Sequence, residues 1–380
     1  MARVRVLLVM VVVVISMMSA PVAAPGGEVV PASTAPECDY PLTITDGTEA
    51  EVTIDAPPEE IVVMHASGAQ VAQDIGVWDR VTGAPVTPFT AYLEEHDAPT
   101  DVTDDEGFPV VEVIVDLDPD LVIAGHVADT ETVATLRDRG LTVYTGPPPA
   151  DVEDIRQKVL TYGALLDACD AAAERASWMD DRLEDVEARL DGMEERPLAY
   201  YELGDGWTTG EGTFQHDLIE RAGADNLGAE AGLEGWAIVD EEVVVAMDPD
   251  FIVYGDATDE PLVSDAIRET PAMQQNRTVM VDSNLVNQAG PRVVLVIETM
   301  AEAFSDGPIE AVDEADREPD ETDDAPAPNG ADEETVESPD DEPEVTTQAD
   351  DDDTAEALPG FGAIAAIIAI SAGVLRVRRR

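Results

Sequence analysis

The amino-acid sequence predicts an α/β protein with two similar lobes, each built on a mostly parallel sheet, and with one long interlobe helix joining them. The main observation is a phrase that occurs twice. Residues 111–125 return as residues 241–255, and seven of the fifteen positions are identical. The other observation is that short apolar runs alternate with helical patterns along the chain. Because this alternation is typical of βαβ units, we expect open, mostly parallel sheets.

Both copies of the phrase have the same physical interpretation. An apolar stretch with an acidic start ends at Asp118-Pro119-Asp120 in the first copy and at Asp248-Pro249-Asp250 in the second. Proline ends a helix there because it has no amide donor and disfavours the α region for the residue before it. Four apolar residues without alternation follow, and they fit a strand that is buried on both faces. Each copy therefore predicts a helix, a turn and a buried strand.

The first lobe is predicted over residues 42–150. Residues 42–54 alternate in polarity on both sides of Asp46-Gly47, which predicts a β-hairpin. The further elements follow in chain order: a strand at 60–64, a helix at 69–75, a strand at 80–83, a loop-rich segment at 84–109, the first phrase copy, a helix end at 137–140 and a strand at 141–144.

The interlobe helix is predicted over residues 151–192. Residues 151–190 contain no proline and one glycine, and their apolar residues recur at helical spacing. Such a helix would span about 50 to 60 Å, broken at most once, near Gly163. A heptad-like dimer helix is the alternative. The apolar stripe thins after Trp178, which favours a monomer.

The second lobe is predicted over residues 193–304. It begins after Pro197 and ends with a helix that has Pro291 in its first turn. Its elements are a strand at 198–201, a glycine-rich loop at 204–213, a helix at 214–222, the second phrase copy, a strand at 278–281 and the closing helix at 291–304.

The ends of the chain predict export and attachment to a membrane. Two arginines, an apolar run and small residues predict a signal peptide over residues 1–24, followed by a lead-in over residues 25–41. Residues 305–358 contain 23 acidic residues and one arginine, so we expect an acidic disordered spacer. Residues 359–380 end in an arginine cluster after an apolar run, and their simplest interpretation is a single C-terminal membrane anchor.

The composition excludes some classes of function. The formal net charge is −63, with 83 acidic residues, and Lys158 is the only lysine. Charge repulsion of this size excludes nucleic acid as a partner, and the acidity is typical of a protein adapted to high salt. The sequence has no Gly-x-Ser-x-Gly and no phosphate-binding loop with Gly-Lys-Ser/Thr. We therefore expect neither an enzyme nor a cofactor.

The two cysteines, Cys38 and Cys169, predict one disulfide, because cysteines of exported chains are commonly paired. Two unpaired buried thiols are the alternative. Asn276-Arg277-Thr278 is a glycosylation sequon, which makes Asn276 a candidate acceptor.

Several motifs together resemble one family. Pro58 to Val63 with the Ser67, Gly76 and Gly83 that follow, the Asp-Pro-Asp phrases, Gly210 to Phe214, Ala222 to Asn226 and Gly290-Pro291-Arg292 resemble the substrate-binding proteins of ABC transporters for Fe3+-siderophores and cobalamin. The resemblance covers about residues 40–304. The C-terminal segment resembles the PGF-CTERM sorting signal of halophilic archaeal surface proteins, with Pro359, Gly360 and Phe361 as its recognition element.

The resemblance implies a ligand cleft between the lobes, in which the protein captures cobalamin or a ferric chelate outside the cell. It also implies delivery to an ABC permease with its ATPase, and anchoring on the outer face of the membrane. Haem is a further ligand that the sequence leaves open. In open α/β sheets, ligands lie beyond the carboxyl ends of the strands. The side chains expected at the cleft are His65, Ser67, Gln70, Phe89, Tyr92, His126, Trp207, Thr209, Trp236, Asn287 and Arg292.

Some of these residues have structural alternatives. Ser67 is equally suited to capping a helix, Phe89 and Tyr92 to core packing, and Arg292 to an ion pair. Two other functions stay open at this point. His65, His126 and His216 with Asp282 would suit a bare Zn2+ or Mn2+ ion. A surface protein with a purely structural or interaction role is the other alternative.

Overall fold

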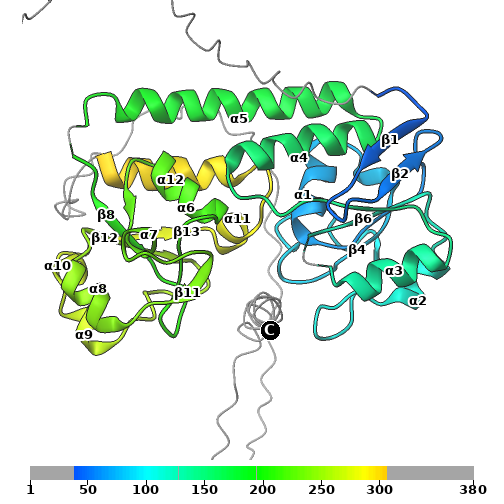
Figure 1. Ribbon diagram of the computed structural model, residues 1–380. Helices are drawn as coiled ribbons and strands as arrows, with labels where there is room; N and C mark the ends of the chain where they lie inside the picture. Colours follow the sequence, from blue (N-terminus) through cyan, green and yellow to red (C-terminus); the bar gives the residue numbers. More distant parts are fainter. Residues whose placement is uncertain (1–37, 127, 194, 306–380) are drawn as a thin grey trace, which may run out of the picture. The chain divides into compact units, whose positions relative to one another are not determined.

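The structure is a computed structural model that describes residues 38–126, 128–193 and 195–305 (Figure 1). Its first sheet has the strand order β5-β4-β3-β6-β7, and every neighbouring pair is parallel. The strands are β3 (Ile61–Val63), β4 (Val81–Ala84), β5 (Thr100–Asp101), β6 (Leu121–Ala124) and β7 (Val143–Thr145).

The second sheet has the order β10-β8-β12-β13 and is also parallel throughout. Its strands are β8 (Leu198–Tyr201), β10 (Asp225–Asn226), β12 (Phe251–Gly255) and β13 (Thr278–Val281). Two antiparallel two-stranded sheets stand outside these: the hairpin of β1 (Leu42–Thr45) with β2 (Glu51–Ile54), and a ribbon of β9 (Trp207–Thr209) with β11 (Trp236–Ile238), which are not consecutive in the chain. The predicted α/β class with mostly parallel sheets is confirmed.

Helices connect the parallel strands, as parallel pairing requires. Those of the first lobe are α1 (Ala66–Asp74), the 3-10 turn η1 (Trp78–Arg80), α2 (Val111–Asp116) and α3 (Thr130–Asp138). Those of the second lobe are α6 (Phe214–Arg221), α7 (Leu227–Glu230), α8 (Glu241–Met247), α9 (Asp265–Arg268), α10 (Pro271–Gln274), α11 (Ser283–Asn287) and α12 (Val293–Ser305).

The central strands are buried on both faces, as the unbroken apolar runs predict. In β3, Ile61 and Val63 belong to the largest core cluster, whereas Val62 belongs to a second cluster on the opposite face of the sheet. In β12, Val253 faces the same large cluster and Ile252 faces a third one. This split follows from the two-residue period of a strand. The large cluster contains residues of both sheets, so one continuous core underlies the two lobes.

The repeated phrase folds in the same way twice, as α2-β6 and as α8-β12. The aspartate before each proline has a positive φ, 47° at Asp118 and 50° at Asp248. The aspartate after each proline ties down the strand beside it. The Asp120 carboxylate accepts the backbone N–H of Glu59 at 2.8 Å, and the Asp250 carboxylate accepts that of Leu198 at 2.9 Å. The phrase is therefore scaffold in both lobes.

The prediction of one continuous interlobe helix over residues 151–192 is wrong, whereas the single break that it allowed near Gly163 is confirmed. The segment forms two helices, α4 (Val152–Leu165) and α5 (Cys169–Leu190), which pack against each other (Figure 1). The reversal comes at Asp167, whose φ is 53°. Gly163 permits the close return, because a Cβ there would meet the Ala172 Cβ at 2.3 Å. The break thus lies just past Gly163, and the apolar stripe that suggested one helix belongs to two.

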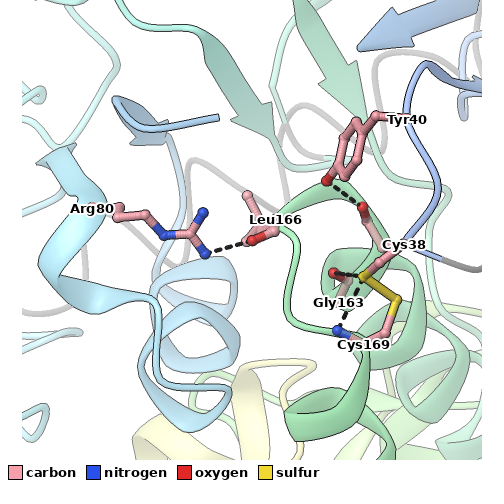
Figure 2. Close-up of a disulfide and its surroundings, with 7 residues drawn as sticks. Cys38, Tyr40, Arg80, Gly163, Leu166 and Cys169 are labelled. Atoms are coloured by element: carbon pink, nitrogen blue, oxygen red, sulfur yellow. Dashed lines mark hydrogen bonds between the residues drawn. A yellow bond between two sulfur atoms is a disulfide. The ribbon is translucent and has the colours of Figure 1, made fainter. Parts of the chain in front are cut away.

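The predicted disulfide between Cys38 and Cys169 is present, with the Cα atoms 5.9 Å apart (Figure 2). It joins the N-terminal arm to the first residue of α5. Beside it, the Tyr40 hydroxyl donates to the Ala164 carbonyl at 2.8 Å and the Arg80 guanidinium donates to the Leu166 carbonyl. The turn between α4 and α5 is therefore held from both sides.

In the part of the chain that the structure describes, no helix is both long and apolar enough to cross a membrane. The predicted signal peptide, nearly all of the acidic spacer, and the sorting segment with Pro359, Gly360 and Phe361 lie outside the described residues. Those predictions stay predictions.

Candidate functional site

The residues that follow the central strands gather where the two lobes meet. Parallel pairing sets Val63 beside Ile123, so the carboxyl ends of β3 and β6 share one edge, and His65 and His126 follow at that edge. In the second lobe, the segment after β13 carries α11 and the chain that leads to α12. We call the contacts of residues 65–92 and Lys158 with residues 287–292 the interlobe seam.

His65 is held on all sides by protein groups. It is the N-cap residue of α1, and its Nδ1 accepts the Gly68 N–H at 3.0 Å. Its Nε2 lies 3.1 Å from the Tyr162 hydroxyl. Burial, then Lys158 and His126, lower its pKa well below the usual histidine value. A Cβ at Gly125 would come within 2.8 Å of the ring, so glycine makes room for it. His65 therefore positions α1 and has no free ring nitrogen.

Lys158, on α4, forms hydrogen bonds with both lobes through its Nζ atom. Its Nζ donates to Ser67 Oγ at 2.8 Å and to the Ala289 carbonyl at 2.9 Å, and it lies 5.5 Å from the centre of the Tyr162 ring. Desolvation by burial lowers its pKa to about 7. Ser67 thus binds Lys158, while His65 caps α1. Sequence reasoning missed Lys158, and the only available signal was that a single lysine stands among arginines.

Gln70 and Tyr92 link the two lobes by hydrogen bonds across the interlobe seam. The fully buried Gln70 donates through Nε2 to the Tyr92 hydroxyl at 2.6 Å and accepts the backbone N–H of Arg292 at 3.1 Å. The Tyr92 hydroxyl in turn donates to Gln288 Oε1 at 2.9 Å. Burial, the main cause, raises the pKa of Tyr92 to about 12. The polar groups of both predicted ligand residues are therefore occupied by the protein.

Two further predicted ligand residues are also engaged. Arg292 forms a two-point ion pair with Asp74, with Nη2 to Oδ1 at 2.6 Å and Nε to Oδ1 at 3.1 Å. This is the ion pair that the acidic composition offered as the alternative. Asn287 accepts from the Tyr201 hydroxyl at 3.2 Å and donates to the Ser283 carbonyl at 3.0 Å.

The β9-β11 ribbon presents an aromatic face. Trp207 pairs with Ile238 and Thr209 pairs with Trp236, so these four positions share one face of the ribbon. Both tryptophans are half-buried, and Ile238 is 58% exposed. Thr209 is fully buried, and its hydroxyl has no hydrogen-bond partner among the described residues. Thr209 therefore lies on the same face as the tryptophans but is covered by protein, and it offers a ligand no accessible surface.

The tryptophans divide into two kinds. Trp78 and Trp178 pack against the largest core cluster, whereas Trp207 and Trp236 pack against none of the three clusters formed by the described residues. Phe89 of the first lobe also stands outside these clusters and is 39% exposed. Its carbonyl accepts from Gln288 at 2.8 Å, which sets it beside the seam. Apolar side chains that solvent reaches thus come from both lobes.

His126 is an exposed residue two positions beyond the carboxyl end of β6. Its side chain is exposed to solvent, yet the surrounding protein lowers its pKa to about 4, mainly by desolvation and then through Lys158. Two surface hollows elsewhere, of about 610 and 460 Å³, are lined by α5 and α6 residues and by residues around the disulfide.

The alternative metal set does not come together. In the described residues, no group of three or more histidine, cysteine, aspartate or glutamate side chains could hold a metal ion. His216, on α6, lies 3.4 Å from the Asn226 amide, and Asp282 caps α11 by accepting two backbone N–H groups. Asn276 of the sequon is exposed at a turn with φ 53°, and its modification stays a prediction.

The chain is similar to known binding proteins. Residues 61–282 match the family model described as periplasmic binding protein. A curated protein of Halobacterium salinarum named "Cobalamin-binding protein" is 36% identical over 278 residues, which cover 70% of this chain and 75% of that protein. An "Uncharacterized ABC transporter substrate-binding lipoprotein" of Bacillus subtilis is 28% identical over 275 residues, 70% of this chain and 86% of the relative.

Solved structures agree on the fold. An "ABC-type Fe3+-hydroxamate transport system" protein of Saccharomonospora viridis superposes with a TM-score of 0.57 at 26% identity, covering 70% of this chain and 99% of that one. A variant of the "heme binding protein HmuT" superposes with a TM-score of 0.59 at 18% identity, over 74% of this chain and 96% of that one. The second likeness concerns the fold alone.

Proposed function

This chain belongs to the periplasmic binding protein family and is a substrate-binding component of an ABC importer, and we propose that its substrate is cobalamin. The observation that carries the proposal is the 36% identity to a cobalamin-binding protein of a halophile, over 70% of this chain and 75% of that protein. The acidic composition of this chain suits the same high-salt setting.

The exposed apolar side chains fit a large planar ligand. Phe89 comes from the first lobe, and Trp207, Trp236 and Ile238 come from the ribbon of the second. Aromatic rings stack on flat conjugated surfaces and keep one face apolar at little entropic cost. In this proposal they cover the faces and edges of the corrin, and His126 borders the same cleft. Gln70, Tyr92, Asn287 and Arg292 hold the lobes in position behind it.

A ferric chelate is the second candidate, because the Fe3+-hydroxamate protein is 26% identical over 70% of this chain. A direct binding panel separates the two. The mature folded part, kept in molar salt, is titrated with cyanocobalamin, a ferric hydroxamate and haemin by isothermal titration calorimetry. Saturable one-to-one binding of cyanocobalamin alone supports the proposal. Binding of the hydroxamate with none of cyanocobalamin would overturn it in favour of the second candidate.

The remaining steps of transport follow from the same proposal. The chain is exported, acts as a monomer and stays on the outer face of the cell membrane through its C-terminal segment, from where it delivers ligand to a permease with its ATPase. The arginine-led apolar start and the Pro359-Gly360-Phe361 segment support this location. Mass spectrometry of the protein from cells tests it, since a sorted and lipid-linked form lacks the final residues while a simple anchor retains them.

A further inference from the structure

Lys158 is an uncompensated cation in a chain of extreme acidity. Its Nζ contacts a hydroxyl, a carbonyl and the face of a phenol ring, and it forms no ion pair with a carboxylate in the described part of the chain. Nine of the twelve described arginines do form such pairs, most of them with carboxylates on other elements. Lys158 therefore lacks a carboxylate partner although the chain is rich in acids and Arg292, in the same seam, has one.

The surroundings of Lys158 raise the free-energy cost of its positive charge. Ser67 is the second residue of α1, so Lys158 lies at the positive end of that helix, where cations are disfavoured. His65 and His126 are close enough to act on one another and on Lys158. The ammonium group of Lys158 is partly buried, so it loses hydration without gaining a carboxylate partner among the described residues.

The position also lies between the lobes, where a ligand would be held. One lysine atom binds Ser67 of the first lobe and Ala289 of the second, and His126 beside it is reached by solvent. An ammonium group carries three N–H donors, of which two are used here. No third hydrogen bond of this ammonium group is formed within the described residues; its other contact is with the face of the Tyr162 ring.

We propose that Lys158 is a ligand-binding residue that recognises an anionic oxygen group of the substrate, a phosphate or a carboxylate, with His126 as its neighbour on the cleft side. The inference rests on the proposed function and narrows its substrate class. Cobalamin supplies such a group as its phosphodiester, and haem supplies it as propionates.

Paired ligands test the assignment. Affinities are measured for cyanocobalamin against dicyanocobinamide, which lacks the phosphate and nucleotide, and for haemin against its dimethyl ester. In Lys158→Met, the affinity for the anionic ligand, cyanocobalamin or haemin, should fall about 10- to 100-fold. The affinity for its analogue without the anionic group should not change, so the ratio of the two affinities should fall by the same factor. Lys158→Arg should keep most of the ratio. Arg156→Met removes a charge from the same helix, away from the seam, and should change neither value. An unchanged ratio in Lys158→Met would overturn the proposal.

A second measurement decides the case in which no paired ligand binds. Such a result would overturn the cobalamin proposal without testing the Lys158 assignment. Because Lys158 is the only lysine, ¹³Cε-lysine labelling gives a single side-chain signal. Its pKa is followed by NMR while inorganic phosphate or acetate is added. A rise of the pKa with saturation supports an anion site, and a constant pKa in both titrations contradicts it.

Discussion

Arg292 and Asp74 join the two lobes through a two-point ion pair, because Asp74 ends α1 and Arg292 precedes α12. Arg175 of α5 binds the second oxygen of the same carboxylate at 2.6 Å. The Asp74 side chain is only 5% exposed, so one buried carboxylate pairs with two arginines from different elements.

Asp74→Asn should destabilise the protein by about 3–5 kcal/mol, because it leaves two partly buried guanidinium groups without a counter-charge. Denaturant unfolding at constant salt measures the change. Asp180→Asn provides the matched control. It removes a more exposed partner from the Arg156 pair and should cost about 0–1 kcal/mol. Equal losses of unfolding free energy in Asp74→Asn and Asp180→Asn would show that the Asp74 ion pairs stabilise the protein no more than the exposed Arg156–Asp180 pair.

Lys158 should make the free energy of unfolding depend on pH. Its pKa is about 7 in the folded state against an ordinary value of 10.5, so the unfolded chain binds more protons between these values. Stability should therefore rise with pH from about 7 to 10.5, and Lys158→Met should be more stable than wild type at neutral pH but not at pH 10.5. His65 and His126 titrate below this window and the pKa of Tyr162 is raised well above 10, so the difference between the two proteins isolates the lysine. Urea unfolding of both proteins across the window checks the slope. A stability difference that stays constant with pH would contradict it.

Trp207→Ala and Trp236→Ala should weaken cyanocobalamin binding about tenfold or more while changing stability little, since neither ring packs against a core cluster. Trp178→Ala is the control. That ring packs on the core with the Arg175 guanidinium 3.7 Å from its centre, so the variant should lose stability and keep its affinity. Calorimetric titration and thermal unfolding of the three variants check both halves. Unchanged affinity in both ribbon variants would exclude the ribbon from the site.

Removing the disulfide in a Cys38→Ser, Cys169→Ser double variant should cost about 2–5 kcal/mol, because the bond closes a loop of 131 residues. Ligand affinity should stay the same, since the bond lies at the α4-α5 turn and the seam lies elsewhere. Denaturant unfolding of the wild type with and without reductant should reproduce the loss, and reductant should leave the double variant unaffected. An effect of reductant on the double variant would point to another cause.

Much of the fold could be predicted from local pattern. The twin phrases determined two helix-turn-strand units, because proline and a four-residue apolar run act within a few positions of the chain. The hairpin around Asp46-Gly47 is likewise set by residues close together in the chain. The disulfide could join only Cys38 and Cys169, because the sequence has no other cysteine. The α4-α5 reversal was not predictable in this way. The apolar spacing continues on both sides of Asp167, and only the packing of Gly163 against Ala172 shows that the chain turns back.

The sequence by itself determined the class of fold, the position of the strand ends, and Trp207 and Trp236 as candidates for ligand contact. Only the tertiary structure decided which polar side chains are already used. Lys158 meets Ser67 and Ala289, which lie 91 and 131 positions away, and Arg292 meets Asp74 at a separation of 218. Hydrogen bonds and ion pairs form between groups that packing brings within about 3 Å, and separation along the chain does not reveal that distance. For this reason Arg292, which the sequence suggested as a ligand-binding residue, instead joins the two lobes through an ion pair. Lys158, which the sequence placed only on a helix, is the proposed ligand-binding residue.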